Sequence, residues 1–353
     1  MRFTILTPDA QYPDDAIVER KVAGEDVAFL LHRTRDPAAI PEADLAACDA
    51  FLVWHEMRID RSLIAKAPNC RIIVRAGVGY NHINLEDAAA AGIPVCNTPD
   101  YGTSEVADHT IGFLLSLVRG IPEFQDRMRK DIKTPWIYPE TTCMRRIRGT
   151  TLGLVGLGRI GTATALRAKA FGFRIVAYDP HVSRGTEIAV GVERVETLED
   201  LLRQSDIVSL HCPLTPETTH MIDAAAFAAM KPGVLLLNTA RGPVVDLAAL
   251  YQAMRDGKVA GAALDVLPVE PPPVDEPLIR DFLAQEDWLT GRLLLTPHGA
   301  WNSPESRHDA RRLSIETVMG YLTAGRIRNL VNGDLLDPAR TRDWRAPADR
   351  LAR

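Results

Sequence analysis

The sequence predicts an α/β protein of two domains, each built on a doubly wound parallel sheet. Three observations lead to this fold class. The chain has 353 residues, more than the core of one domain usually holds. Short apolar segments alternate with helical ones, a pattern that favours parallel strands joined by right-handed crossovers. The alternation weakens after residue 130 and restarts at residue 149, which separates two such units.

Apolar segments that break into turns predict the strands of the first domain, residues 1–102. These segments are "MRFTILTPD", "DAFLVWHEMRI", "CRIIVRAGVGYNHIN" and "IPVCN". Segments rich in alanine predict the helices between them, which are "IPEADLAACDA", "RSLIAKAPN" and "NLEDAAAAG". Alternation of this kind places the strands in one parallel sheet.

A long helix over residues 103–130 is predicted to lead out of the first domain. A connector rich in Pro and Arg follows over residues 131–149, and strands then alternate with helices to about residue 300. A charged amphipathic helix is expected after Trp301, ending at Gly325. The polar residues 334–353 are expected to form a loose C-terminal tail.

Composition and charge argue against several classes of partner. The chain is 46% hydrophobic and 25% charged, as soluble globular proteins are, and its formal net charge is -5. This charge gives no electrostatic case for nucleic acid or an anionic membrane, since both favour basic surfaces. No apolar run has the length of a secretory signal or a membrane span. We therefore expect a protein that binds neither nucleic acid nor membrane.

The cysteines are odd in number and scattered, at positions Cys48, Cys70, Cys96, Cys143 and Cys212. No pair has the spacing of metal ligands, and an odd number cannot all form disulfides. We expect reduced thiols in a cytoplasmic protein, and no metal site. Cys212 follows His211 in "LHCPLT", where the histidine suits a structural role at a strand end. An apolar strand end would raise the pKa of the Cys212 thiol, so we expect no redox role for it.

A glycine-rich loop joins the apolar strand "LGLV" to a helix. The loop is Gly156-Leu157-Gly158-Arg159-Ile160-Gly161, and the next strand, "FRIVAY", ends at Asp179. Gly156 permits a tight turn, Gly158 lets a pyrophosphate approach the backbone, and Gly161 lets the helix pack on the strand. The diphosphate then lies on the helix-start amides around Arg159 and Ile160. Asp179 can bind the adenosine ribose and would repel a 2′-phosphate, so the loop predicts NAD rather than NADP.

Further strand ends carry residues that can act on an acid substrate. Arg241 follows the strand "VLLLNTA", Glu270 lies on a proline-rich loop after "GAALD", and His298 follows "RLLLTP". In a doubly wound sheet the carboxyl ends of the strands border the ligand crevice, so these residues can converge. A guanidinium binds and polarises an anionic carbonyl compound, and an imidazole exchanges a proton with its oxygen. A carboxylate beside the imidazole favours its charged form. With a nicotinamide alongside, these groups predict reversible carbonyl reduction.

These motifs resemble the D-isomer-specific 2-hydroxyacid dehydrogenase family. The matching blocks are "LVGLGRIG", "HCPLTPETTHMIDAAAFAAMKPGVLLLNTARGPVVD", "GAALDVLPVEP" and "TPHGAW". The resemblance covers about residues 45–330. Within the family, "PDYGTSEVADHT" and the tryptophan of "HGAW" resemble the subgroup of C-terminal-binding-protein-like dehydrogenases.

The resemblance implies a role for each matching residue. His298 would be the general acid/base, Glu270 its partner, and Arg241 the residue that holds the carboxylate and carbonyl of a 2-oxo or 2-hydroxy acid. Further implied contacts with the substrate are the backbone amides of Val78 and Gly79, nearby Arg75, and Trp301 as a pocket wall. Implied contacts with the cofactor are Asp265, to the nicotinamide carboxamide, and Thr239 and Ala240, which would line its binding site.

The resemblance also implies a domain organisation. A Rossmann-type NAD-binding domain would span residues 103–300, and a flavodoxin-like substrate-binding domain would combine residues 1–102 with 301–333. The substrate cleft would lie between the two domains, with a hinge near residues 101–104 and 300–302. The long helix after the first domain would help to build a homodimer.

Structural roles are the alternative for each residue taken singly. Arg241 suits a surface ion pair, Glu270 a loop charge, and His298 a strand-end cap. Asp265 suits a turn cap, and Trp301 suits packing in the core or at a domain interface. Arg75, likewise, could pair with a carboxylate of its own domain.

Two rival functions remain open at the level of sequence. One is an NAD(H)-gated interaction protein of the C-terminal-binding-protein type. The other keeps the dehydrogenase fold but acts on phosphoglycerate, formate or phosphite. One departure from the family pattern is the long connection between Glu270 and His298, which carries the insert "VDEPLIRDFLAQEDWLTGR".

Overall fold

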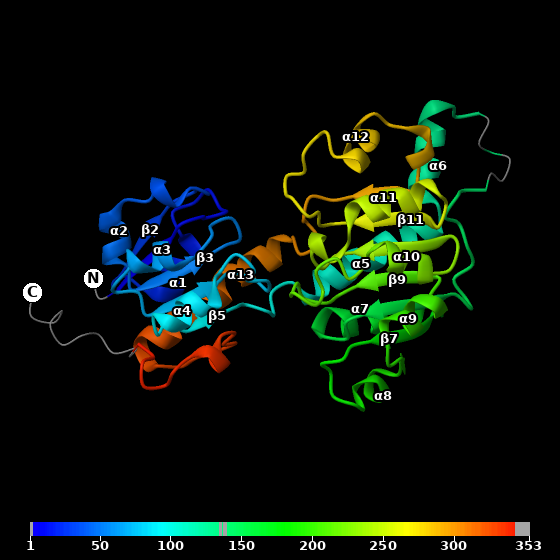
Figure 1. Cartoon of the computed structure of the whole chain (residues 1–353). Coiled ribbons are helices and arrows are strands. Elements are labelled where there is room, and N and C mark those ends of the chain that lie inside the picture. Colours follow the sequence, from blue (N-terminus) through cyan, green and yellow to red (C-terminus); the bar gives the residue numbers. More distant parts are fainter. Residues whose placement is uncertain (1–2, 134–135, 137–139, 343–353) are drawn as a thin grey trace, which may run out of the picture. The chain divides into compact units, whose positions relative to one another are not determined.

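The computed structural model describes residues 3–133, 136 and 140–342, and it divides into two compact units (Figure 1). Unit 1 comprises residues 1–102 and the chain from residue 303 onward, and unit 2 comprises residues 103–302. The second division falls two residues after the predicted border between 300 and 301. Among the described residues, no helix is long and apolar enough to cross a membrane.

Unit 1 is built on a five-stranded parallel sheet with strand order β2-β1-β3-β4-β5. The strands are β1 (Phe3–Thr7), β2 (Val27–Leu31), β3 (Ala50–Val53), β4 (Ile72–Arg75) and β5 (Val95–Cys96). This order is the flavodoxin-like one, in which the chain reverses direction across the sheet between β1 and β3. Edge strand β2 is absent from the predicted strands, although "VAFLL" is an apolar run of suitable length. The flavodoxin-like fold class is confirmed.

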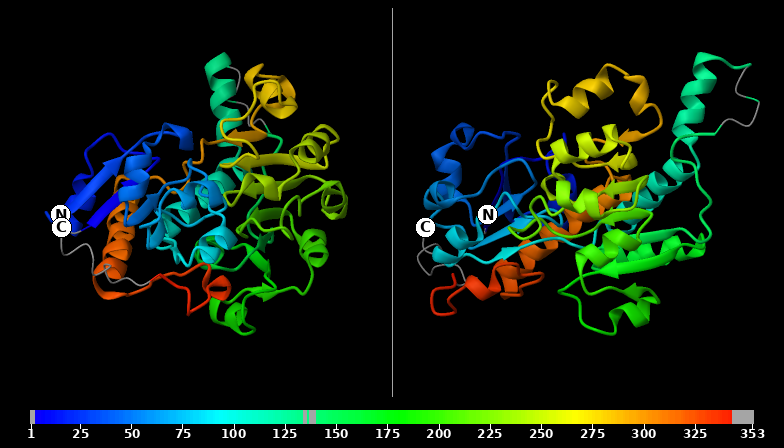
Figure 2. Two further views of the ribbon diagram at one scale, coloured as in Figure 1. Left: turned by 60° about the vertical axis from the view of Figure 1, so that its left-hand side comes forward. Right: turned by 45° about the vertical axis from the view of Figure 1, so that its right-hand side comes forward.

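Helices lie on both sides of the sheet of unit 1 (Figure 2). They are α1 (Ile17–Ala23), α2 (Glu42–Ala47), α3 (Arg61–Ala65), α4 (Leu85–Ala90) and α13 (Pro304–Ala324), with short 3-10 turns η1 (Pro37–Ala39) and η5 (Gly333–Leu335). Local sequence explains several of their ends. The side chain of Asp60 accepts from the amides of Ser62 and Leu63 at the start of α3. Gly325, at a φ of 65°, ends α13 where the sequence predicts.

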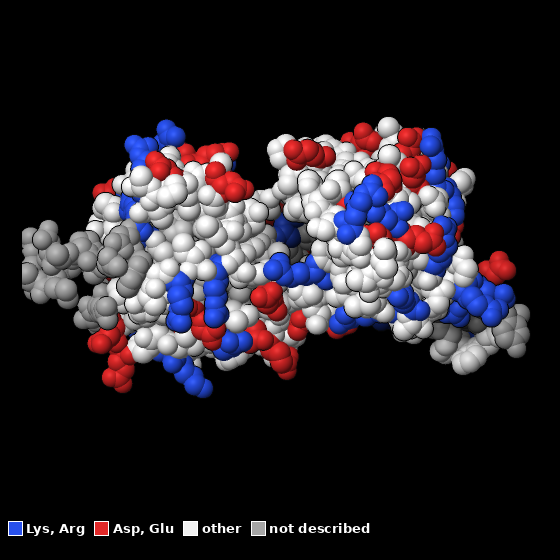
Figure 3. Space-filling model, turned by 90° about the horizontal axis from the view of Figure 1, so that it is seen from below, with Lys and Arg blue, Asp and Glu red and all other residues white. Residues whose placement is uncertain are grey.

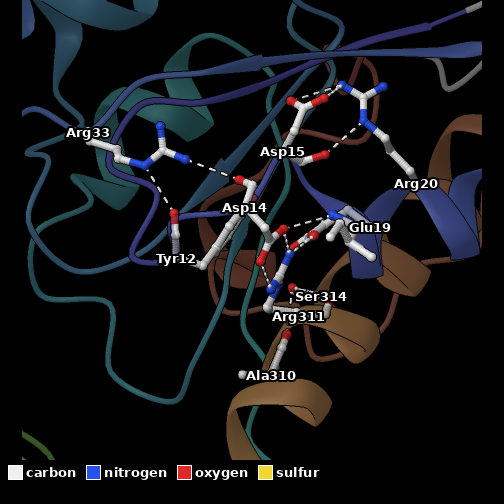
Figure 4. A network of polar contacts seen from close by, with 10 residues as sticks. Tyr12, Asp14, Asp15, Glu19, Arg20, Arg33, Ala310, Arg311 and Ser314 are labelled. Carbon is white, nitrogen blue, oxygen red and sulfur yellow. Dashed lines mark hydrogen bonds and ion pairs between the residues drawn. The ribbon is translucent and has the colours of Figure 1, made fainter.

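An ion-pair network inside unit 1 ties α13 to α1 and to the segment between β1 and α1 (Figure 4). The guanidinium of Arg311 donates to both carboxylate oxygens of Glu19, at 2.8 and 2.6 Å, and to both of Asp14, at 2.7 Å each. Its carbon lies 3.7 Å from the ring centre of Tyr12. The Glu19 side chain is fully buried. A charge buried in this way needs a paired partner, and Arg311 supplies it from 292 positions away.

The predicted loose tail is wrong for its first part, which packs on unit 1. The guanidinium of Arg342 donates to the carbonyls of Pro68, Cys70 and Ala91, and its own carbonyl accepts from the hydroxyl of Tyr321. These hydrogen bonds satisfy backbone carbonyl groups of unit 1. The polar composition of the tail does not show that such bonds form. The rest of the predicted tail, residues 343–353, lies outside the described residues.

Unit 2 is built on a seven-stranded parallel sheet with strand order β12-β11-β10-β9-β6-β7-β8. The strands are β6 (Thr151–Val155), β7 (Arg174–Tyr178), β8 (Glu193–Arg194), β9 (Ile207–Leu210), β10 (Val234–Asn238), β11 (Val259–Leu264) and β12 (Leu293–Leu295). The order reverses between β6 and β9, as it does in a Rossmann-type sheet. The Rossmann-type fold predicted for this part of the chain is confirmed.

Both faces of this sheet are buried under helices (Figures 1 and 2). Leu236 belongs to the core on one face, and its neighbours Leu235 and Leu237 belong to the core on the other. Burial on two faces explains the unbroken apolar run of β10. The helices are α5 (Thr103–Val118), α6 (Ile121–Lys130), α7 (Arg159–Ala170), α8 (Thr186–Val190), α9 (Leu198–Gln204), α10 (Ala224–Ala229), α11 (Leu247–Arg255) and α12 (Pro277–Leu283), with turns η3 (Gly242–Val244) and η4 (Asp287–Leu289).

The single helix predicted over residues 103–130 is wrong, because the chain breaks it into α5 and α6 at Gly120. Gly120 has a φ of 64°, in the left-handed region that favours glycine. A Cβ at this position would lie 2.1 Å from the Thr141 hydroxyl oxygen. The break therefore serves a close tertiary approach, which helical periodicity cannot show.

The insert between Glu270 and His298 folds onto α11. Its helix α12 is held by a hydrogen bond from the Tyr251 hydroxyl to a carboxylate oxygen of Asp281, at 2.9 Å. The ring of Trp288 meets Tyr251 edge-on, and the guanidinium of Arg292 donates to four surrounding carbonyls, including that of Trp288. The insert is thus an ordered part of unit 2.

Basic and acidic side chains are mixed on the face of the molecule seen in Figure 3. No continuous basic area covers that face. This mixture agrees with the formal net charge of -5.

Candidate active site

The predicted functional residues of unit 2 follow one row of paired residues across its sheet. This row runs over six strands and consists of Leu295, Leu264, Asn238, Leu210, Val155 and Tyr178. The next residue of each strand therefore lies at the same sheet edge; these residues are Thr296, Asp265, Thr239, His211, Gly156 and Asp179. Parallel register brings together side chains that are far apart in sequence, as the strand-end argument predicts.

The glycine loop has the conformation that its sequence demands. Gly156 has a φ of 100°, and a Cβ there would lie 2.8 Å from the backbone of His211. A Cβ on Gly161 would lie 2.1 Å from the carbonyl oxygen of Gly156. A Cβ on Gly158, in contrast, would meet no atom within 4 Å. Two glycines are thus required by packing and one borders open space at the start of α7, which fits a loop that a diphosphate approaches.

Asp179 links the end of β7 to the glycine loop. One carboxylate oxygen accepts from the amide of Leu157 at 2.8 Å, and the other accepts from the amides of His181 and Val182. These bonds orient the carboxylate beside the loop. Arg194 donates to the carbonyl of Asp179 and lies within 4 Å of the carboxylates of Glu187 and Glu196, so acidic groups balance the charge of this arginine.

Arg241 is positioned by the end of β10. The buried side chain of Asn238 accepts from the amide of Ala240 and donates to the carbonyl of Arg241, at 3.0 and 2.9 Å. A Cβ on the next residue, Gly242, would lie 2.0 Å from the backbone of Leu267. The glycine therefore allows the Arg241 turn to approach the loop that carries Glu270. Neither Asn238 nor this role of Gly242 was predicted from the sequence, although both stand in the block "LNTARG".

His298 and Glu270 form a direct pair. The imidazole Nδ1 lies 2.7 Å from one carboxylate oxygen of Glu270, whose other oxygen accepts from the amide of Leu267 at 2.9 Å. Both side chains are about one-third exposed, at 30% for His298 and 36% for Glu270. The pair is therefore accessible to solvent and to a small ligand.

The electrostatics of Glu270 keep it ionised. Partial burial acts to raise its pKa, but the hydrogen bond and charge of His298, the Leu267 amide and the charge of Arg241 outweigh burial and lower the pKa below 4.5. An ionised carboxylate only accepts hydrogen bonds, so Nδ1 of His298 carries a proton. The structure thus brings Arg241, Glu270 and His298 into one electrostatic group.

Asp265 holds the turn that presents His298. One carboxylate oxygen accepts from the Thr296 hydroxyl at 2.5 Å and from the Gly299 amide at 2.8 Å, and the other accepts from the Ala300 amide at 3.0 Å. The backbone carbonyl of Asp265 accepts from the His298 amide at 2.8 Å. His298 has a φ of 53°, which is uncommon for a residue with a side chain and is held by these bonds. The predicted contact of Asp265 with a carboxamide stays a prediction.

His211 and Cys212 are partly buried residues that follow the end of β9. Burial lowers the pKa of His211 to about 4, and its Nε2 lies 2.9 Å from the Ser209 hydroxyl. Burial raises the pKa of Cys212 to about 11, as predicted. At neutral pH both groups are uncharged, which suits packing against the glycine loop.

The predicted substrate contacts Arg75, Val78 and Gly79 belong to unit 1. Arg75 is buried, and its guanidinium donates to the backbone carbonyls of Ala76 and Gly79, the latter at 2.8 Å. The carbonyl of Val78 accepts from the Asn97 side chain at 2.7 Å. The guanidinium thus holds the loop that contains Val78 and Gly79, and its charge also acts on the carboxylate of Asp9 in the same unit.

Two further residues complete the comparison with the sequence. Trp301 is partly exposed and follows the His298 turn, and its role stays a prediction. His109 on α5 was not predicted at all, yet its ring lies 3.1 Å from the Thr296 hydroxyl. A histidine within an apolar helix face was the signal that could have found it.

A Rossmann-type sheet whose strand ends carry a glycine loop and a histidine–glutamate pair has the features of a dinucleotide-dependent oxidoreductase. Comparisons with known proteins identify the family. The family model of the D-isomer specific 2-hydroxyacid dehydrogenase NAD binding domain matches residues 111–300. The chain belongs to this family.

Relatives of known name agree with this assignment. A glyoxylate reductase of Korarchaeum cryptofilum is 39% identical over 290 residues, which cover 82% of this chain and 84% of the relative. A D-3-phosphoglycerate dehydrogenase of Methanocaldococcus jannaschii is 34% identical over 334 residues, or 93% of this chain. The chain spans only 59% of the length of that second relative.

Solved structures agree as well. D-lactate dehydrogenase of Aquifex aeolicus, in complex with NAD and lactic acid, superposes with a TM-score of 0.80 at 31% identity and covers 91% of this chain and 96% of its own. An NADPH-dependent glyoxylate/hydroxypyruvate reductase of Sinorhizobium meliloti, in complex with NADP and malonate, has a TM-score of 0.80 at 30% identity and covers 97% of this chain and 98% of its own. The family and the enzyme class predicted from the sequence are confirmed.

Proposed function

We propose that this chain is an NAD-dependent dehydrogenase that interconverts a 2-oxo acid and its D-2-hydroxy acid. The observation that carries the proposal is the 2.7 Å contact between His298 and Glu270, within the electrostatic reach of Arg241. The pair and the arginine supply the two things that reduction of a 2-oxo acid requires, a proton donor and a cation for the carboxylate. NADH, when bound, supplies the hydride.

The three side chains divide the work according to their chemistry. Arg241 binds the carboxylate and polarises the carbonyl oxygen with its planar fork of donors. Nδ1 of His298 is occupied by Glu270, so Nε2 is the atom that gives its proton to the substrate oxygen. Glu270 stabilises the imidazolium before that transfer and fixes the ring orientation. In the reverse direction, the neutral Nε2 takes the proton from the alcohol.

Asp179 supports NAD as the cofactor. Its carboxylate is held at the end of β7 by backbone amides and would repel the 2′-phosphate of NADP. The solved relatives include complexes of both cofactors, so a direct comparison is needed. We expect NADH to bind at least tenfold more tightly than NADPH in fluorescence titrations, and Asp179→Ser to reduce this ratio. A wild-type preference for NADPH would contradict the proposal.

The first test of the reaction follows the absorbance of NADH in the presence of 2-oxo acids. Glyoxylate, hydroxypyruvate, pyruvate and phenylpyruvate cover a range of sizes. We expect oxidation of NADH by the wild type and a fall in kcat of at least about a hundredfold in His298→Ala, the usual contribution of a general acid. NADH binding should be retained in this variant. Equal rates in the two proteins would remove His298 from the mechanism.

The contacts of Arg75 support an acid without a phosphate group as the substrate. A phosphorylated substrate calls for additional cations, and the guanidinium of Arg75 is already bonded to the carbonyls of Ala76 and Gly79. We therefore expect higher kcat/KM for glyoxylate or hydroxypyruvate than for phosphohydroxypyruvate. The opposite ranking would favour a phosphoglycerate-type activity.

We also propose that the protein is a homodimer of the cytoplasm. Exposed apolar side chains at and beyond the start of α6, those of Ile121, Ile132 and Trp136, suit burial against a second copy. All five cysteines are free, as suits a reducing compartment. Light scattering coupled to gel filtration would give the mass, and a monomer at micromolar concentration would contradict the proposal.

A further inference from the structure

Helix α5 contacts the ends of two strands through adjacent polar side chains. Nε2 of His109 lies 3.1 Å from the hydroxyl oxygen of Thr296, which follows β12. The hydroxyl oxygen of Thr110 lies 2.9 Å from that of Thr239, which follows β10. His298 and Arg241 each come two residues after one of these threonines. One turn of α5 therefore contacts both strand ends that lead to the proposed catalytic residues.

The direction of the hydrogen bonds follows from counting hydrogens. Thr296 has a single hydroxyl hydrogen, and it points to a carboxylate oxygen of Asp265 at 2.5 Å. The Thr296 oxygen can then only accept from His109, so Nε2 of His109 carries a proton. The result is a chain of donors that runs from His109 through Thr296 to Asp265.

Counting hydrogens also identifies the donor in the contact between Thr110 and Thr239. The hydroxyl of Thr110 donates to the carbonyl of Val106 at 2.7 Å, one turn earlier in α5. The Thr239 hydroxyl must therefore donate to Thr110. Thr110 is fully buried, so this bond is shielded from water and fixes the end of β10 against α5.

Asp265 in turn holds the backbone turn that carries His298. Its carboxylate accepts from the amides of Gly299 and Ala300, and its carbonyl accepts from the amide of His298. These three bonds hold His298 in its left-handed conformation, at a φ of 53°. The orientation of the imidazole toward Glu270 thus depends on Asp265, and Asp265 is in turn held by Thr296.

We propose that His109 is a positioning residue that orients His298 through Thr296 and Asp265. It makes no contact with the reacting atoms in this role. The proposal rests on the proposed function, because it concerns the residue to which that function assigns the proton transfer. It extends the site to a helix outside the strand-end motifs.

A simple packing role for His109 predicts different behaviour. The imidazole meets the ring of Phe113 edge-on, with ring centres 4.5 Å apart. If packing on Phe113 were the only role of His109, another aromatic side chain at position 109 would serve equally well. Two substitutions separate the possibilities, because His109→Phe keeps a ring but loses the donor, and His109→Gln keeps an N–H donor at similar reach but loses the ring.

The first measurement is hydrogen–deuterium exchange in the full-length protein without nucleotide or acid. We expect exchange of the His298, Gly299 and Ala300 amides to be about fivefold faster in His109→Phe, the effect of losing one hydrogen bond. His109→Gln should exchange like the wild type. Thr296→Val, which removes the middle of the chain, should accelerate these amides at least as much. His308→Phe, at an exposed histidine of α13, is the matched control and should change nothing.

The second measurement is turnover with the best 2-oxo acid. We expect kcat to fall about fivefold in His109→Phe and to recover in His109→Gln, with KM within twofold throughout because Arg241 still holds the acid. Wild-type exchange in His109→Phe or in Thr296→Val would overturn the proposal, as would equal acceleration in His109→Phe and His109→Gln. If the wild type reduces none of the acids, the proposed function fails, and the exchange data still decide whether His109 holds the turn.

Discussion

Removal of the Arg311 guanidinium tests how unit 1 is held together. Arg311→Met keeps an unbranched chain of similar length but leaves Glu19 and Asp14 without their shared cation (Figure 4). The two carboxylates differ in their access to water. The Glu19 side chain is 0% exposed and the Asp14 side chain is 25% exposed, so water can compensate the second but not the first.

The expected loss follows from these exposures. An unpaired carboxylate at the position of Glu19 should cost roughly 3–5 kcal/mol of the free energy of unfolding. The partly exposed pair with Asp14 should add at most about 1 kcal/mol, and the lost stacking on Tyr12 about the same. Together these contributions predict a loss of at least about 4 kcal/mol in unit 1. Because 1.36 kcal/mol is a factor of ten, this predicts at least a hundredfold rise in the opening equilibrium of α1.

Hydrogen exchange resolved by peptide measures this opening in each unit separately, which a single unfolding curve of a two-domain protein does not. Peptides from β6 in unit 2 serve as the internal reference. Arg312→Met is the matched control, since Arg312 is the next residue of α13 and pairs with Asp309 and Glu316 at about one-third exposure. Its loss should cost under about 1 kcal/mol.

A double variant sharpens the test. In Arg311→Met combined with Glu19→Gln the buried carboxylate is gone, so part of the lost stability should return. If Arg311→Met exchanged no faster in α1 than Arg312→Met, the buried ion pair would not be what stabilises unit 1. That result would refute the reasoning from burial.

Two further predictions concern the network and the site. Arg311 lowers the pKa of Asp14 to about 2 from 3.8, so the stability that this pair contributes is complete above about pH 4 and lost as the pH falls toward 2. The protection of α1 peptides, corrected for intrinsic exchange, should therefore fall more between about pH 5 and about pH 3 in the wild type than in Asp14→Asn. Gly242→Ala places a Cβ against the Leu267 backbone and should lower kcat/KM for a 2-oxo acid at least about tenfold through displacement of the Glu270 loop. Gly112→Ala, in α5 with no atom within 4 Å, is its control, and equal kinetics in both variants would dismiss the contact.

Much of the candidate site follows from local sequence. Arg241, Asp265 and His298 could be located because each comes within three residues of the end of an apolar strand, and parallel strands share one edge for their carboxyl ends. Each glycine of the loop could be interpreted separately, because each has its own reason to lack a side chain. Gly156 forms a tight turn, Gly158 leaves room for a pyrophosphate, and Gly161 lets the helix pack on the strand. The prediction of a single helix over residues 103–130 was wrong because the helix breaks at Gly120, which lies close to Thr141. A tertiary contact of this kind does not alter the pattern of apolar residues from which the helix was predicted.

The sequence by itself determined the fold class, the strand ends and the residue types available for hydride-transfer chemistry. These properties depend on periodicity, on backbone freedom at glycine and on short spacing, all of which are local. Tertiary structure alone decided which groups are paired. His109 contacts Thr296 across 187 positions of the sequence, and Arg311 contacts Glu19 across 292. At such separations the sequence does not show which residue is the partner. Only the folded chain excludes water around these groups, and the loss of water is what makes each hydrogen bond necessary.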